Sequence, residues 1–297
     1  MSTFKQLAII GSTASGKTAL AVKVVQKLDA HILSLDSLSI YKEIDIVSAK
    51  PTVEERQGII HFGIDHLYPN ESFDVTTYID LYTQVREKCR KEKKNLVIVG
   101  GTSFYLKMLL EGISQRPKLT DEQTTTILQQ MHNPTDVYTM LMEVDPTYMQ
   151  KIERGDSYRM QKALEIFVAT GEKPSSYFKA NPPQPIIAEP LPIYEISWDR
   201  KILRERIKIR TEQMVKQGLI DEIIALEKKY TRAPNCMKAI GIKETLMYLD
   251  GIYDKEMLVE KIAVNTGRLA KRQVTFNNSQ FENVVKESLE NLEKRLL

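Results

Sequence analysis

The sequence predicts an α/β protein: a doubly wound, mostly parallel sheet that carries a phosphate-binding loop (P-loop), with an inserted helical domain. Three observations support this prediction. A Walker A pattern lies between an apolar run and a helix-compatible stretch, apolar runs alternate with helix-period segments up to residue 117, and the strand pattern is lost over residues 118–192. We therefore expect residues 1–117 to form the first part of the core, 118–192 a helical insert, and 193–297 the rest of the core with C-terminal helices.

The phosphate-binding loop follows the first apolar run, residues 7–10, and precedes a helix-compatible stretch at residues 19–28. Its residues are Gly11, Ser12, Thr13, Ala14, Ser15, Gly16, Lys17 and Thr18. The glycines allow backbone N–H groups to turn inward, and the start of the helix adds positive partial charge, so the loop suits a diphosphate or triphosphate. We expect Lys17 to neutralise the distal phosphates and Thr18 to bind Mg²⁺.

Two further apolar runs, residues 31–35 and 96–99, have the character of buried parallel strands. Between them, residues 75–94 have helical periodicity. Ligands of doubly wound sheets bind at the carboxyl ends of the strands. We therefore expect the phosphate-binding loop, Asp36-Ser37 and Gly100-Gly101-Thr102 to converge on one crevice.

The predicted insert is mostly helix-compatible over residues 120–179. Asp121 and Asp145 are suited to begin helices there, and Gly171 is suited to end one. The proline-rich residues 181–192 cannot continue a helix and are predicted to be a connector.

A last strand is predicted at residues 193–198, and Asp199 is suited to cap the basic helix that follows. Arg206 and Arg210 lie on one face of this helix, four residues apart. A basic helix usually presents solvated charge. Arginine also braces leaving phosphate groups, so one of these side chains is a candidate for the crevice.

Asp36 is the carboxylate of most interest, because it ends an apolar strand and faces the phosphate-binding loop. Three roles fit this position: holding Mg²⁺ through water, acting as a general base, or serving as the N-cap of a helix that follows. Thr102 follows two glycines, and it either offers its hydroxyl and N–H to a phosphate or a reacting group or caps the helix that begins at Ser103.

The composition is ordinary for a globular protein, with 42% hydrophobic and 27% charged residues and a net charge of +3. No apolar run approaches the roughly 18 residues of a spanning helix, so we expect a cytoplasmic protein with no membrane partner. We also expect a monomer. Cys89, Cys236 and the four histidines show no metal-ligand spacing.

Positive charge is concentrated near the C-terminus. Residues 193–297 contain 20 Lys and Arg against 16 Asp and Glu, whereas residues 118–192 contain seven against ten. Residues 268–276 combine cationic and aromatic side chains, a composition that suits RNA backbone contacts and base stacking or, equally, a solvated helix face. Any RNA-binding surface is therefore expected to draw mainly on this part of the chain.

These motifs together resemble those of bacterial tRNA dimethylallyltransferases, also called tRNA isopentenyltransferases. Residues 36–51, DSLSIYKEIDIVSAKP, are similar to the family pattern DSxxIYxxMDIGTAKP. Further similar blocks follow in family order and cover nearly the whole chain: residues 100–112 (GGTSFYLKMLLEG), 156–165 (DSYRMQKALE), 238–244 (KAIGIKE) and 268–275 (RLAKRQVT).

The resemblance implies an enzyme that binds dimethylallyl diphosphate in the phosphate-binding loop and transfers the prenyl group to the exocyclic amine (N6) of the adenosine 3′-adjacent to the anticodon. It implies that Asp36 accepts a proton from the amine, that Thr102 helps to place the reactants, and that Lys17 and Arg206 stabilise the departing diphosphate. It also implies Mg²⁺ at Thr18 and the anticodon stem-loop of tRNA as the partner.

By the same resemblance, the tRNA contacts come from both the core and the insert: Asp36, Ser37, Leu38, Ser39, Thr102, Tyr158, Arg159, Met160, Gln161, Lys162, Lys238, Gly241, Lys243, Lys271, Arg272 and Gln273. The net acidity of the insert indicates that selected residues, such as Arg159 and Lys162, bind RNA there. The chain departs from the family pattern at five positions in these regions: Thr124, Ile242, Phe276, Asn277 and Asn278.

Three other functions compete with this one. A small-molecule kinase would use ATP, a related prenyltransferase would act on free adenosine nucleotides, and an RNA-binding module would carry an inactive loop. The intact Lys17, Thr18, Asp36 and Thr102 favour an enzyme, and the helical insert and basic C-terminal segment favour tRNA over a free nucleotide.

Overall fold

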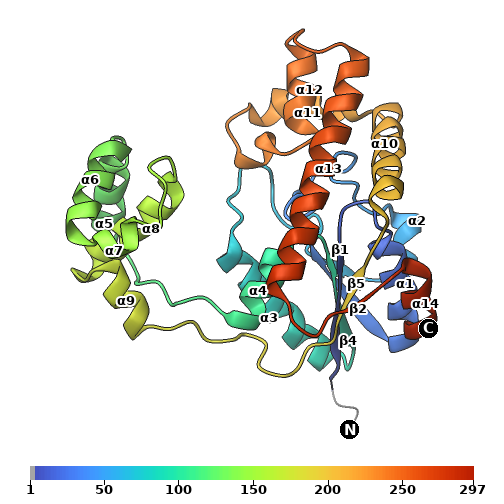
Figure 1. The fold of residues 1–297 in the computed structure, drawn as a ribbon, viewed down its shortest axis with the longest axis horizontal. Coiled ribbons are helices and arrows are strands. Elements are labelled where there is room, and N and C mark those ends of the chain that lie inside the picture. Colours follow the sequence, from blue (N-terminus) through green and yellow to red (C-terminus); the bar gives the residue numbers. More distant parts are fainter. Residues whose placement is uncertain (1–3) are drawn as a thin grey trace. The chain divides into compact units, whose positions relative to one another are not determined.

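The computed structural model describes residues 4–297, and in this part of the chain six strands form one sheet. Their order across the sheet is β3-β2-β4-β1-β5-β6, and every pairing is parallel, which confirms the predicted doubly wound α/β fold (Figure 1). The strands are β1 Gln6–Gly11, β2 Ala30–Leu35, β3 His61–Phe62, β4 Asn95–Gly100, β5 Ile193–Ile196 and β6 Val285–Glu287.

The central strands are buried because they are apolar on both faces. Ile9, Ile32 and Ile98, one from each of β1, β2 and β4, are fully buried. The strands also end in register: Gly100 pairs with both Leu35 and Ile10, and Gly11 pairs with Ile196. The loops that follow these four strands therefore begin at one edge of the sheet, as a binding crevice requires.

The helices of the core lie on both faces of the sheet (Figure 1). Side chains of α1 and of the C-terminal helix α14 pack on one face, in a cluster that includes Ile9, Val25 and Leu292. These helices are α1 Lys17–Leu28, α2 Val53–Arg56, α3 Val75–Lys91, α4 Ser103–Glu111, α10 Arg200–Lys216, α11 Leu219–Tyr230, the 3₁₀ helix η1 Asn235–Lys238, α12 Ile242–Leu249, α13 Lys255–Gln280 and α14 Leu289–Leu296.

The chain divides into two compact units, one extending to Leu110 and resuming at Ile187–Leu297, the other formed by Glu111–Ile186. The second unit is helical: α5 Asp121–Gln130, α6 Pro134–Val144, α7 Pro146–Met149, α8 Ser157–Thr170 and α9 Pro174–Ala180. It has its own apolar core, in which Leu141, Met149 and Leu164 are fully buried. The limits of the functional insert, predicted at residues 118 and 192, remain a prediction.

Most of the predicted elements are confirmed. Asp145 and Asp199 cap α7 and α10, and Gly171 ends α8 with a left-handed φ of 72°. The predicted strand at residues 193–198 is shorter, ending at Ile196. β3 and β6 were missed, because strands of two and three residues are too short to show periodicity. No helix among the described residues is long and apolar enough to cross a membrane.

Candidate active site at the carboxyl ends of the strands

The phosphate-binding loop connects β1 to α1 through a tight turn. Gly16 immediately precedes α1 with a left-handed φ of 92°, and Ala14 also has a positive φ of 62°. A Cβ on Gly11 would lie 3.0 Å from the carbonyl oxygen of Ile196, so a side chain there would crowd the neighbouring strand. The Lys17 ammonium folds back over the loop and donates a hydrogen bond to the Ser12 carbonyl oxygen at 2.6 Å.

Two side chains from the segment after β5 donate hydrogen bonds to backbone carbonyl oxygens of this loop. The Arg206 Nε donates to the Ala14 carbonyl oxygen at 2.8 Å, and the Trp198 indole N–H donates to the Ser15 carbonyl oxygen at 2.9 Å. The Arg206 guanidinium stacks 4.5 Å above the Trp198 ring. Arg206 therefore lies at the phosphate-binding loop, where the sequence placed it. Trp198 was missed, although it is the single tryptophan of the chain and directly follows a core strand.

Lys17, Arg210 and Asp36 form an electrostatic cluster beside the loop. Burial and, to a lesser extent, the neighbouring Arg210 lower the pKa of the Lys17 ammonium to about 7, while Asp36 opposes the shift. Burial also lowers the pKa of the Arg210 guanidinium, again opposed by Asp36. Arg210 donates a hydrogen bond to the Ala49 carbonyl oxygen at 3.4 Å. The site thus concentrates positive charge where a diphosphate would sit, with one carboxylate at its border.

Asp36 and Thr102 approach each other through the ends of their strands. The Asp36 Oδ1 accepts hydrogen bonds from the N–H groups of Leu38 at 2.8 Å and Ser39 at 3.0 Å, so it caps a turn and not a helix. The Thr102 N–H donates to the Leu35 carbonyl oxygen at 3.0 Å. This approach requires Gly100, because a Cβ there would lie 2.2 Å from the Leu35 carbonyl oxygen. Asp36 and Thr102 therefore lie at the same edge of the sheet as the phosphate-binding loop.

Gln273, on α13, bridges two loops of the site. Its Oε1 accepts a hydrogen bond from the Thr13 N–H at 2.9 Å, and its Nε2 donates to the Gly101 carbonyl oxygen at 2.9 Å. A Cβ on Gly101 would lie 2.5 Å from this Nε2. Gln273 was predicted as a tRNA contact. Its amide ties the phosphate-binding loop to the loop that carries Thr102, and the tRNA contact remains a prediction.

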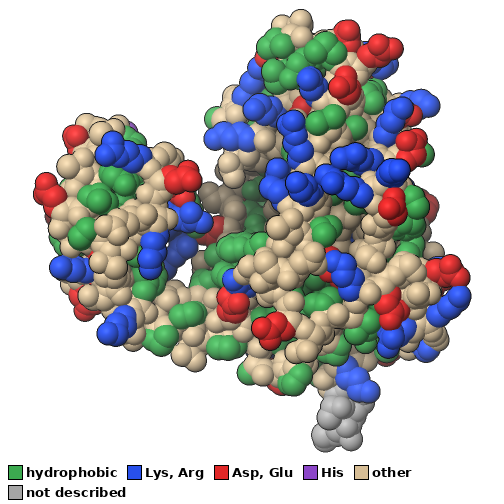
Figure 2. Space-filling view, viewed as in Figure 1, with side chains coloured by type: hydrophobic (Ala, Val, Ile, Leu, Met, Phe, Trp, Pro, Cys, Tyr) green, Lys and Arg blue, Asp and Glu red, His purple; other side chains and the backbone are tan. Residues whose placement is uncertain are grey.

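Other predicted tRNA contacts of the core differ in exposure. Lys238, Lys243, Lys271 and Arg272 are exposed. Lys and Arg side chains gather over the middle of α13 and beside α10 (Figure 2). Gly241, in contrast, is buried, and a Cβ there would lie 2.3 Å from the Val47 Cγ2. This close packing explains why the position is occupied by glycine, which has no side chain to contact tRNA.

Asn277, a departure from the family pattern, has a structural role. It is 1% exposed, and its Nδ2 donates to the Glu195 Oε1 on β5 at 3.1 Å. Lys286 pairs with the other oxygen of Glu195 at 3.2 Å. The neighbouring Asn278 accepts a hydrogen bond from Lys286 at 2.7 Å. Asn277 therefore joins α13 to the sheet, and the loss of the family residue there says little about RNA.

In the helical unit, the residues predicted to contact tRNA lie on α8. Tyr158 is 52% exposed and the Arg159 side chain 65% exposed, and Arg159 pairs with Asp156 at 3.0 Å. The Lys162 ammonium lies 5.5 Å from the Tyr158 ring centroid and pairs with Glu165 at 2.7 Å. Met160 is fully buried in the core of this unit, so its side chain is removed from the predicted contacts.

Comparison with known proteins identifies relatives along nearly the whole chain. Residues 39–280 match the model of the IPP transferase family. The chain is 63% identical to the tRNA dimethylallyltransferase of Sulfurovum sp., over 99% of this chain and 97% of that protein. It is 52% identical to the enzyme of the same name from Sulfurimonas denitrificans, over 98% of each chain.

Solved structures give the same result. The tRNA isopentenylpyrophosphate transferase of Bacillus halodurans matches with a TM-score of 0.71 and 28% identity, over 99% of this chain and 94% of that chain. A eukaryotic dimethylallyltransferase acting on tRNA matches with a TM-score of 0.82 and 25% identity, over 97% of this chain and 75% of that chain.

Proposed function

The chain belongs to the IPP transferase family, and we propose that it is a tRNA dimethylallyltransferase. In this reaction the dimethylallyl group passes from dimethylallyl diphosphate to N6 of the adenosine 3′-adjacent to the anticodon, and diphosphate is released. The observation that carries the proposal is the convergence of the phosphate-binding loop, Arg206, Asp36 and Thr102 at one edge of the sheet. The close relatives share this name.

The donor diphosphate binds in the phosphate-binding loop. The inward backbone N–H groups and the N-terminus of α1 hold its oxygens, and Lys17 and Arg206 contribute the charge. As the bond between the allylic carbon and the bridging oxygen breaks, negative charge grows on the diphosphate. Fixed cations in a partly dry site stabilise that charge more than water would. Arg210 joins them, because it lies close enough to shift the pKa of Lys17.

Mg²⁺ fits this loop through few protein ligands. Among residues 4–297, no group of three or more His, Cys, Asp or Glu side chains is placed to hold a metal. Mg²⁺ bound to a diphosphate needs only one or two protein ligands, since phosphate oxygens and water supply the rest. Thr18, exposed in the first turn of α1, would hold it. When bound, Mg²⁺ neutralises charge on the leaving group.

Asp36 and Thr102 act on the acceptor. The lone pair of the adenine N6 is delocalised into the ring, so the amine must be oriented and lose a proton as the new carbon–nitrogen bond forms. Asp36 accepts that proton, while its turn with Leu38 and Ser39 fixes the carboxylate in place. Thr102 orients the amine. The base must leave the anticodon-loop stack to reach them.

The tRNA surface combines two sets of residues. In the core, Lys238, Lys243, Lys271 and Arg272 contact the phosphate backbone. In the helical unit, the exposed ring of Tyr158 offers a stacking surface and Arg159 a cation.

The proposal is tested by incubating the protein with radiolabelled dimethylallyl diphosphate and Mg²⁺ in parallel with unmodified tRNA, AMP and ATP. We expect label to enter tRNA alone, at the adenosine beside the anticodon. Labelling of AMP or ATP would favour the enzyme of free nucleotides. A parallel incubation with γ-labelled ATP, in which any acceptor became phosphorylated, would replace the proposal with a kinase.

A further inference from the structure

We propose that Glu222 is a positioning residue, which holds the turn formed by residues 44–50 and through it fixes Asp36 in the active site. This inference rests on the proposed function, because Asp36 is there the general base. Glu222 lies in the first turn of α11 and is not part of the phosphate-binding loop or of the loops that carry Asp36 and Thr102. Its carboxylate reaches the backbone of a segment more than 170 residues earlier in the chain.

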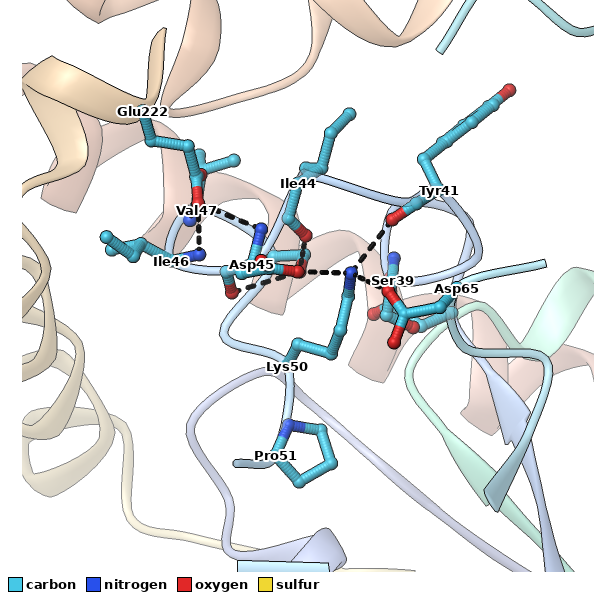
Figure 3. A network of polar contacts seen from close by, with 12 residues as sticks. Ser39, Tyr41, Ile44, Asp45, Ile46, Val47, Lys50, Pro51, Asp65 and Glu222 are labelled. Carbon is cyan, nitrogen blue, oxygen red and sulfur yellow. Dashed lines mark hydrogen bonds and ion pairs between the residues drawn. The ribbon is translucent and has the colours of Figure 1, made fainter. Parts of the chain in front are cut away.

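The Glu222 carboxylate accepts hydrogen bonds from three successive backbone N–H groups (Figure 3). One oxygen accepts from Asp45 at 2.9 Å and Ile46 at 2.7 Å, and the other accepts from Val47 at 3.0 Å. Three consecutive N–H groups that point to one side form a concave anion site, and hydrogen bonds to an ionised acceptor are about twice as strong as neutral ones. Glu222 supplies the anion for this turn.

The turn needs such a partner because its backbone is unfavourable alone. Glu43 and Ala49, on either side of the bound N–H groups, have left-handed φ values of 65° and 50°. Residues with a Cβ adopt this region at an energetic cost, which the surrounding contacts must offset. Val47 supplies one such contact, since its side chain packs on Gly241 at the start of α12. The turn is therefore held from both α11 and α12.

A chain of hydrogen bonds connects the turn to Asp36. The buried Lys50 ammonium, with a side chain 3% exposed, donates to the Asp45 carboxylate at 2.6 Å and to the Tyr41 carbonyl oxygen at 2.8 Å (Figure 3). The Tyr41 N–H donates to the Leu38 carbonyl oxygen at 3.2 Å.

The last link returns to the carboxylate itself, because the Leu38 N–H donates to the Asp36 Oδ1 at 2.8 Å. A second link leaves the other end of the turn, where Arg210 donates to the Ala49 carbonyl oxygen. Displacement of the turn would therefore move both the general base and a cation of the diphosphate site.

The test compares Glu222→Gln with the control Glu227→Gln. Glutamine keeps the size of Glu222 but loses its charge and turns an NH₂ donor toward backbone N–H groups. Glu227 lies on the same helix and pairs with Arg232 on the surface, away from the turn. Three quantities are measured for each protein: amide hydrogen exchange, the affinity for dimethylallyl diphosphate, and the rate of single-turnover transfer to tRNA.

For Glu222→Gln we expect exchange at residues 45–47 to accelerate at least about tenfold, while the amides of α1 keep their protection. Transfer at saturating donor and tRNA should slow by about 10- to 100-fold, the usual effect of a displaced reacting group. Donor affinity should fall far less than the transfer rate, by no more than about threefold, because Lys17 and Arg206 contact the phosphate-binding loop and not the turn, and only Arg210 would be displaced. Glu222→Asp, which keeps the charge on a shorter side chain, should recover part of the rate.

Transfer within about twofold of wild type, unchanged exchange at residues 45–47, or the same losses in Glu227→Gln would each overturn the inference. Exchange that accelerated equally in α1 would also overturn it, because Glu222 would then support the fold as a whole. If wild-type protein transferred no prenyl group to tRNA, the proposed function would fail, while the exchange data would still decide whether Glu222 holds the turn.

Discussion

At the scale of single residues, the site is built around Lys17, a half-buried lysine of the phosphate-binding loop. Burial and the neighbouring Arg210 bring the pKa of Lys17 to about 7, so near neutral pH a substantial fraction of the ammonium is unprotonated before the donor arrives. A diphosphate favours the charged form and raises this pKa. We therefore expect donor binding to be coupled to proton uptake.

This coupling predicts a pH-dependent uptake of protons. Above pH 7 the free Lys17 is largely neutral and the bound one charged, so uptake at pH 8 should approach roughly one proton, whereas at pH 6 both forms are charged and uptake by Lys17 should be small. Calorimetric titration with dimethylallyl diphosphate in buffers of different ionisation enthalpy measures it. Lys17→Arg, which is always charged, should lose the difference between the two pH values. Equal uptake by both proteins would contradict the prediction.

Asp36 allows the roles of base and structural cap to be separated. Asp36→Asn keeps an oxygen that can accept from Leu38 and Ser39, so the turn should persist. The variant lacks the general base, so single-turnover prenyl transfer should fall by about 10²- to 10⁴-fold, while tRNA affinity stays within a few-fold. Filter binding and rapid quench measure the two quantities. Parallel losses in binding and rate would assign Asp36 to positioning, and near-wild-type transfer would exclude the base.

At the scale of elements, helix α13 presents functional candidates on two different faces. Gln273 faces the site loops, whereas Lys271, two residues away and thus about 200° around the helix, is exposed. Arg272 is exposed beside it. One helix thus carries both a side chain that holds the phosphate-binding loop and exposed cationic side chains.

The exposed Lys271 and Arg272 predict how the affinity for tRNA depends on salt concentration. Replacing Lys271 and Arg272 by alanine should weaken binding of all substrate tRNAs alike and make the slope of log affinity against log salt shallower by about 1 to 2, since fewer counterions are released. Affinity for free dimethylallyl diphosphate should be preserved, because the donor is held by the loop at Lys17. An unchanged slope would mean that these side chains form a solvated face and would shift attention to Arg159 and Lys243.

At the scale of the whole molecule, the helical unit Glu111–Ile186 leaves and re-enters the core at one place. The Ile187 N–H donates to the Leu109 carbonyl oxygen at 2.9 Å, so the two chain ends that border the unit are adjacent. Its apolar core, with Leu141 and Met149, is separate from that of the sheet. Each unit therefore has an apolar core of its own.

Excision of this unit should separate tRNA binding from donor binding. With residues 111–186 replaced by a short Gly-Ser linker, we expect a cooperative melting transition and donor affinity within a few-fold of wild type. Affinity for tRNA should fall at least about tenfold, because Tyr158 and Arg159 are lost. A variant that failed to fold, or one with undiminished tRNA affinity, would show that the unit has another role.

Local sequence was sufficient for the parts of the site that lie within one loop. The spacing of Gly11, Gly16 and Lys17 predicted the phosphate-binding loop, and the apolar runs before Asp36 and Thr102 predicted that both follow core strands. Parallel pairing then brings such loops to one edge whatever the details of packing. The fold class and the central residues of the site were therefore predictable from short-range pattern.

The sequence by itself determined the fold class and which loops follow the central strands, because propensity, apolar pattern and loop motifs are local properties. Only the tertiary structure decided which side chains support them: Gln273 joins two loops, Glu222 binds a turn, and Met160 is buried. These contacts join residues far apart in the chain, and their partners are backbone N–H and C=O groups, which every residue carries and no sequence pattern distinguishes. Which backbone groups these side chains bind is therefore decided only when packing brings the two segments together.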